Sequence, residues 1–175
     1  MKTNHIHKIV TSALMAARTC LSTMIVLTYS PAGGYIHLGD CFVLLSGFLL
    51  GPLWGGLAAA IGSGLTDLIL GAAQYVPATF IIKWGVAALA SVLFRLLSRG
   101  HNHKLPFYAV AGIAGEVIMV VGYFVYEIAL YGFAGALSGV VPNLIQAGSG
   151  VILASLVMIP LSKVKYIQNM FGVGK

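Results

Sequence analysis

The chain has 175 residues, of which 59% are hydrophobic and 8% are charged, and its formal net charge is +6. A soluble domain carries about 25% charged residues, so this composition excludes an ordinary soluble domain and indicates an integral membrane protein. No hydrophilic stretch is long enough to form a second domain, so we expect a single membrane domain over residues 1–175. The basic residues lie mainly at the chain ends and in one loop, which is typical of topology signals and argues against nucleic-acid binding.

Six apolar stretches follow one another along the chain, and each is a candidate transmembrane helix. They cover residues 6–29, 40–51, 54–73, 77–97, 107–131 and 139–161. The second stretch ends at Gly51-Pro52 and is too short to cross a bilayer unaided, because a crossing needs about 20 residues. The sequence therefore predicts an all-α integral membrane protein, a bundle of six transmembrane helices with a short second helix.

The lysines and arginines predict the orientation of this bundle. They precede the first stretch, surround the loop between the fourth and fifth, and follow the sixth, at Lys2, Lys8, Arg95, Arg99, Lys104, Lys163, Lys165 and Lys175. The first, third and fifth loops contain no lysine or arginine. Because positive residues gather on the cytoplasmic side, six spans place both termini in the cytoplasm, whereas five spans would expose the C-terminal lysines outside.

All four acidic residues lie inside or at the edge of apolar stretches, at Asp40, Asp67, Glu116 and Glu127. A carboxylate near hydrocarbon usually faces the protein interior or a water-filled cavity. Asp40, Asp67, Lys83, Glu127 and Asn143 fall at similar depths near the outer ends of their stretches, which predicts a polar pocket close to the external surface. The alternative is that Asp67 and Lys83 form a neutralising pair that joins two helices.

The fifth stretch carries Glu116, Tyr123 and Glu127 within about 40° of one another on a helical wheel. An aromatic ring stacks on a flat heterocycle, and carboxylates accept hydrogen bonds from hydroxyl, amine or ring N–H groups. This face is therefore a candidate ligand-binding face. Glu116 lies deeper than the other two, at the level of Arg18, so a buried Arg18–Glu116 ion pair is the alternative.

Two loops and the sixth stretch complete the predicted pocket. The first loop, residues 30–39, is rich in Pro and Gly and is a candidate lid with Tyr35 and His37 as its reaching side chains. The third loop offers Gln74 and Tyr75 in a similar position, and Gln146 follows Asn143 in the sixth stretch. Interfacial tyrosines are common without any ligand, so these loops could equally be plain connectors.

The sequence contains no evident machinery for catalysis or for ATP hydrolysis. It has no phosphate-binding loop of the G-x-x-x-x-G-K-[ST] type, no H-E-x-x-H metal motif and no serine with a supporting His/Asp spacing. We therefore expect no metal site and no bound cofactor, and concentrative uptake would need energy from partner proteins. Ala13 and Ala17 in the first stretch form a small-xxx-small face suited to close helix packing.

Several strings resemble the substrate-binding S components of energy-coupling factor (ECF) vitamin transporters. They are His37-Leu38-Gly39-Asp40 leading into 44–52, the Gly-rich third stretch ending near Asp67, and residues 77–83 ending at Lys83. The resemblance covers about residues 10–165 and is closest to the branch with riboflavin, hydroxymethylpyrimidine and pyridoxine S components. It implies a six-helix bundle in a prokaryotic cytoplasmic membrane, with a vitamin pocket near its external face.

The resemblance also implies partners. An S component associates with a membrane-embedded T component and two cytoplasmic ATPase subunits, and these partners use ATP and Mg²⁺. In the family, an A-x-x-x-A motif of the first helix packs against the T component, and here it matches Ala13 and Ala17. Toppling of the S component in the membrane is thought to carry the pocket inward.

The polar set suits a small hydroxylated heterocycle, so hydroxymethylpyrimidine or pyridoxine is favoured, with riboflavin or another vitamin as the alternative. Position two is Lys2 and not the histidine of cobalt and nickel members, which argues against metal uptake. Two other classes stay open from the residues themselves. One is a membrane enzyme using Asp67, Glu116 and Glu127 as acid/base groups, and the other is a solitary proton-coupled carrier.

Overall fold

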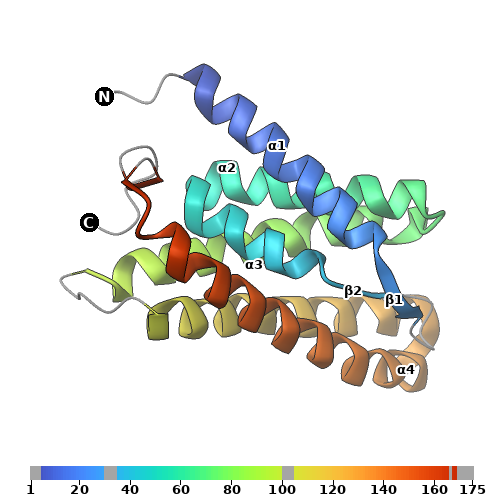
Figure 1. Cartoon of the computed structure of the whole chain (residues 1–175). Coiled ribbons are helices and arrows are strands. Elements are labelled where there is room, and N and C mark those ends of the chain that lie inside the picture. Colours follow the sequence, from blue (N-terminus) through green and yellow to red (C-terminus); the bar gives the residue numbers. More distant parts are fainter. Residues whose placement is uncertain (1–4, 30–34, 100–104, 166, 169–175) are drawn as a thin grey trace.

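The computed structural model describes residues 5–29, 35–99, 105–165 and 167–168. Helices account for most of this part of the chain, and they run roughly lengthwise along the molecule (Figure 1). In chain order the elements are α1 (His5–Met24), β1 (Val26–Tyr29), β2 (Tyr35–His37), α2 (Gly39–Ile69), the 3-10 turn η1 (Ala73–Tyr75), α3 (Val76–Leu97) and α4 (Leu105–Leu161).

Two of the helices are broken at a glycine. Gly51 in α2 has φ 88° and Gly132 in α4 has φ 74°, a region of backbone conformation that glycine adopts without steric cost. Pro52 follows the first break and cannot donate the helical hydrogen bond that would bridge it. The predicted end of the short second helix at Gly51-Pro52 is thus confirmed.

The break in α4 divides it into segments 105–131 and 133–161, each longer than the roughly 20 residues that a crossing needs. The second of these segments begins earlier than the predicted residue 139, because the loop expected over 132–138 is a single non-helical residue. By length and composition, three helical stretches within the described residues are apolar enough to cross a membrane: Gly39–Ile69, Ala73–Leu97 and Leu105–Leu161.

The predicted first helix, 6–29, is wrong at its C-terminal end. The helix ends at Met24, and β1 then pairs antiparallel with β2, with Val26 opposite His37 and Tyr29 opposite Tyr35. Hydropathy alone does not distinguish a short apolar strand from a helix, and Val26 and Thr28 are β-branched residues that favour strands. Part of the predicted lid, residues 30–34, lies outside the described residues.

Charge separates the two ends of the molecule. The hairpin, η1 and the break in α4 lie at one end, and the start of α1, the end of α3 and the end of α4 lie at the other (Figure 1). The second end carries most of the described lysines and arginines, namely Lys8, Arg95, Arg99, Lys163 and Lys165. Between the ends, large apolar side chains are exposed on the outer faces, as at Ile81 (71%) and Val141 (63%), which fits contact with lipid.

Candidate functional site

A small pocket, about 40 Å³ in volume, opens at the hairpin end of the molecule. It is bordered by side chains from α1, β2, α2, η1, α3 and both segments of α4. Its lining comprises Thr23, Tyr35, His37, Ser63, Asp67, Tyr75, Thr79, Lys83, Tyr123, Glu127, Asn143 and Gln146. Nine of these were predicted as pocket residues from the sequence, all except the three hydroxyl residues Thr23, Ser63 and Thr79.

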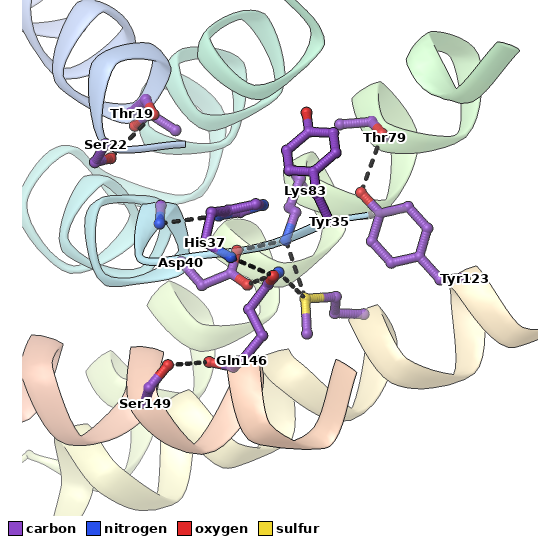
Figure 2. A network of polar contacts seen from close by, with 12 residues as sticks. Thr19, Ser22, Tyr35, His37, Asp40, Thr79, Lys83, Tyr123, Gln146 and Ser149 are labelled. Atoms are coloured by element: carbon purple, nitrogen blue, oxygen red, sulfur yellow. Dashed lines mark hydrogen bonds and ion pairs between the residues drawn. The ribbon is translucent and has the colours of Figure 1, made fainter. Parts of the chain in front are cut away.

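The floor of the pocket is a bonded network around Asp40, which is 0% exposed in the first turn of α2. Lys83 from α3 forms an ion pair with Asp40 Oδ1, and Gln146 Nε2 from α4 donates to Asp40 Oδ2 at 2.7 Å (Figure 2). Lys83 Nζ also lies 3.0 Å from the Met119 sulfur. Both carboxylate oxygens of Asp40 are therefore bonded, and three helices meet at this one side chain.

His37 joins the hairpin to the floor. Its backbone N–H donates to Gln146 Oε1 at 3.1 Å, and its ring Nδ1 accepts from the Gly39 N–H at 3.0 Å (Figure 2). Because Nδ1 accepts, the proton of the neutral ring is on Nε2. Burial lowers the pKa of His37 to about 4, with the Asp40 charge opposing that shift and the Lys83 charge adding to it. The ring is thus neutral near pH 7.

The walls carry two further carboxylates, and each is bonded to a tyrosine. Tyr35 OH donates to Asp67 Oδ1 at 2.5 Å, and Tyr75 OH donates to Glu127 Oε1 at 3.3 Å. Burial and the hydrogen bond to Asp67 raise the pKa of Tyr35, so this phenol is a hydrogen-bond donor at neutral pH. The tyrosines therefore position both acids.

Tyr123 supplies an aromatic surface between these acids. Its hydroxyl and Thr79 Oγ1 are 3.0 Å apart, and its ring centroid lies 5.6 Å from Lys83 Nζ (Figure 2). The Tyr75 ring is 6.3 Å away, tilted by 57°. Together the rings form an amphipathic wall, apolar on the ring faces and polar at the hydroxyls.

Four buried polar atoms of the pocket-lining residues have no hydrogen-bond partner within the described part of the chain. They are Thr23 Oγ1, Ser63 Oγ, Asp67 Oδ2 and Glu127 Oε2, although the Thr79 hydroxyl lies near Asp67. Buried polar groups in proteins are normally hydrogen-bonded to protein or water, so these four atoms have capacity for hydrogen bonds to a bound molecule or to water.

Neither of the two ion pairs considered as alternatives to ligand contacts is formed by the described residues. Lys83 pairs with Asp40 and not with Asp67, and this is the one salt bridge within the described ranges. Arg18 is exposed on α1 while Glu116 is 2% exposed, and both Glu116 oxygens are without a hydrogen-bond partner there. The predicted depths place Lys83, Asp40 and Asp67 at the same level of the bundle, but depth alone does not decide which acid pairs with the lysine.

Three predicted pocket residues lie elsewhere. Asp40 is beneath the pocket, within the floor network. Gln74 is exposed, and its backbone carbonyl, not its side chain, accepts a hydrogen bond from Tyr126 OH. Glu116 lines a separate apolar groove between the two segments of α4, beside residues such as Val117 and Val151. None of these three lines the pocket itself.

The hydroxyl residues that sequence reasoning missed have a recognisable spacing. Ser63 precedes Asp67 by four residues on α2, and Thr79 precedes Lys83 by four on α3. Residues four apart share a helix face, so a search for hydroxyls one turn before a buried charge would have found both. Thr23, near the end of α1, carries no such signal.

Comparison with known proteins defines the class. The model of the family described as "ECF-type riboflavin transporter, S component" matches residues 3–163. The chain belongs to this family of ECF transporter S components. Members of the family are membrane-embedded transport subunits and not enzymes. It is also 33% identical over 134 residues to a Pyrococcus woesei protein described as "Uncharacterized protein in gap 3'region", covering 76% of this chain and 86% of that one.

Proposed function

We propose that this chain captures a small water-soluble vitamin or vitamin precursor at the external face of a cell membrane, for ATP-driven uptake powered by partner subunits. The observation that carries the proposal is the convergence of polar and aromatic side chains from α1, β2, α2, η1, α3 and α4 on one pocket. Small-molecule sites combine apolar walls with a few convergent polar groups, and this pocket has that composition.

The charge distribution supports an outward-facing pocket. With six spans and both termini in the cytoplasm, the basic end of the molecule is inside and the hairpin end is outside. Segment 39–50 of α2 is then the short second helix. The pocket lies at the outer end, where a dissolved ligand reaches it without crossing hydrocarbon.

Ligand size and chemistry favour hydroxymethylpyrimidine or pyridoxine. Each is a single flat ring with hydroxyl groups, which suits stacking on Tyr123 and hydrogen bonds to Asp67 and Glu127. Riboflavin is a second candidate, because the family model that matches the chain is described by that vitamin.

The exposed face of α1 supports docking to a T component, the membrane partner of two ATPase subunits that use ATP and Mg²⁺. Ala13 and Ala17 are exposed, and Met15, Ala16 and Thr19 of the same helix are buried against the rest of the chain. Two small residues one turn apart on a free face allow close approach of another helix.

Binding tests the first part of the proposal. The full chain, purified in detergent, is titrated by calorimetry with hydroxymethylpyrimidine, pyridoxine and riboflavin in separate experiments. Saturable 1:1 binding of one of them supports the function. A folded protein that binds none of them, and no vitamin carried through purification, contradicts it.

Uptake tests the partner interface. Ala13→Trp or Ala17→Trp is expected to abolish uptake in cells that hold the T component and ATPases, while calorimetric affinity is unchanged. Ala129→Trp, which adds the same bulk at an exposed position of α4, is the control. Normal uptake by both α1 variants would contradict the interface. Uptake by this chain alone that an uncoupler stops would instead support a solitary proton-coupled carrier.

A further inference from the structure

We propose that the pocket selects a positively charged nitrogen ligand, with Asp67 and Glu127 as its two anionic recognition groups. The inference rests on the proposed binding function and changes its favoured ligand from neutral hydroxymethylpyrimidine or pyridoxine to a vitamin that carries a positive charge. It follows from the charges of the pocket, from its unused hydrogen-bonding atoms and from its aromatic walls.

The charges of the pocket do not balance within the described residues. Lys83 is the one lysine or arginine among the lining residues, and Asp40 already neutralises it. Asp67 and Glu127 are 5% and 3% exposed, and neither has a described lysine, arginine or histidine nitrogen within ion-pair distance. His37 adds no charge near neutral pH because its ring nitrogen accepts from Gly39 and burial lowers its pKa to about 4.

The hydrogen-bonding atoms that the pocket leaves unused also favour a cationic ligand. Asp67 and Glu127 each use one oxygen to accept from a tyrosine. Among the described residues the second oxygen of Glu127 is buried without a partner, and that of Asp67 has only the Thr79 hydroxyl nearby. An ionised carboxylate only accepts hydrogen bonds, so these two oxygens require donors on the ligand. Hydrogen bonds from a charged donor are roughly twice as strong as neutral ones, which favours a cation over an alcohol.

A glycine in the second segment of α4 leaves space for the Glu127 carboxylate. A Cβ added at Gly139 would lie 2.3 Å from Glu127 Oε2, so the absence of a side chain there makes room for that oxygen. Ser63 Oγ and Thr23 Oγ1, the other two unpartnered atoms, can accept as well as donate. All four atoms are therefore compatible with a donor-rich ligand.

The aromatic walls suit a cation too. The Tyr123 ring lies 5.6 Å from the Lys83 ammonium, which shows that a positive charge is accommodated beside this surface. A ligand cation over a tyrosine face gains further electrostatic attraction from the ring quadrupole. A neutral heterocycle stacks on the same ring but leaves the charges of the two buried carboxylates uncompensated, which is costly.

Matched vitamin pairs test the inference. Pyridoxamine and pyridoxine share a ring and differ by an ammonium in place of a hydroxyl. Thiamine and hydroxymethylpyrimidine share an aminopyrimidine and differ by a positively charged thiazolium. Calorimetry on the full chain at pH 7 is expected to show the cationic member of at least one pair binding about tenfold or more tightly, a difference of about 1.4 kcal/mol.

Charge-neutralising variants assign the preference to residues. Asp67→Asn and Glu127→Gln are expected to reduce it to below about threefold, because they remove the charge and keep the shape. Glu116→Gln neutralises a buried acid that does not line the pocket and is expected to keep the preference. The wild-type comparison of paired ligands stands even where a variant does not fold.

The outcomes separate this inference from the function on which it rests. Equal or tighter binding of the neutral members, or binding of riboflavin unaffected by Asp67→Asn and Glu127→Gln, overturns the cation preference and leaves the transport function standing. A folded chain that binds none of the five compounds contradicts both.

Discussion

The acidic residues in the floor and in the walls of the pocket differ in how completely they are hydrogen-bonded. In the floor, Asp40 has both oxygens bonded, to Lys83 and Gln146, and it is not among the residues that line the pocket. In the walls, Asp67 and Glu127 line the pocket, and each has one oxygen bonded to a tyrosine. Among the described residues the second oxygen of Glu127 has no partner, and that of Asp67 has only the Thr79 hydroxyl nearby. Both regions are buried, so exposure does not explain the contrast.

The difference indicates a division of roles. A bonded and neutralised network holds α2, α3 and α4 together whether or not a ligand is present. Half-bonded acids are positioned by their tyrosines and have capacity left for another molecule. The floor is therefore expected to determine stability and the walls to determine binding.

Removing the Lys83–Asp40 ion pair in the floor is expected to cause the largest loss of stability. Lys83→Met leaves Asp40 buried and unpaired, which is expected to destabilise the fold by about 3–5 kcal/mol. Thermal unfolding in detergent measures the loss. Adding Asp40→Asn in the double variant removes the uncompensated charge and should recover part of the stability. A Tm for Lys83→Met equal to that of the wild type would contradict the role given to this ion pair.

Acid is expected to weaken the attachment of the hairpin. His37 has a pKa of about 4 in the folded chain against 6.5 in its ordinary state, so between these pH values the unfolded chain binds a proton that the folded chain does not. Stability from this group is complete above about pH 6.5 and is lost as the pH falls towards 4, by at most about 3 kcal/mol.

Unfolding at pH 7.5 and pH 4.5 measures this effect. His37→Asn offers an uncharged acceptor in place of Nδ1 and is the control, since it should lose less stability than the wild type over the same interval. An identical loss in both proteins would show that other groups carry the acid dependence.

Crowding a wall acid is expected to separate binding from stability. In Gly139→Ala the new Cβ would press on Glu127 Oε2, so ligand affinity should fall, while the helix gains up to about 1 kcal/mol from alanine propensity. Gly148→Ala is the matched control, because nothing lies within 4 Å of its Cβ position and it gains the same propensity. Equal ligand affinity in both variants, measured by calorimetry, would rule out the close contact.

The smallest effect is expected at Glu116. Its carboxylate has no hydrogen-bond partner and no ion pair within the described ranges, so Glu116→Gln should change the free energy of unfolding by less than about 0.5 kcal/mol or raise it. Asp40→Asn makes the same chemical change at a fully bonded acid and should be clearly destabilising. Equal destabilisation by the two would mean that Glu116 also has a structural partner.

The sequence was sufficient to place the pocket but not to assign its bonds. A charge inside an apolar stretch has few allowed surroundings, which is why the depths of Asp67, Lys83 and Glu127 predicted one shared pocket, and all three line the pocket of the structure. The partner of Lys83 could not be chosen, because Asp40 and Asp67 were expected at similar depths. The break at Gly51 was predictable, since Gly51-Pro52 interrupts any regular helix.

Other features give weaker signals. Hydroxyls in apolar helices often bond their own backbone, as Ser46 does to the Phe42 carbonyl at 2.7 Å, so a serine or threonine does not by itself indicate a pocket. Thr23 and Ser63 were missed for that reason. The hairpin was missed because residues 26–29 are as apolar as the helix before them, and the pairing with residues 35–37 is a contact that hydropathy does not encode.

A structure of the chain saturated with the vitamin that binds it, determined by cryo-electron microscopy or crystallography, tests the central claim most directly. Ligand density is expected against Tyr123, with donors of the ligand on Asp67 Oδ2 and Glu127 Oε2 and the Lys83–Asp40 pair unchanged. Density in the apolar groove beside Glu116, or a ligand that displaces Asp40 from Lys83 and leaves the wall acids untouched, would contradict it.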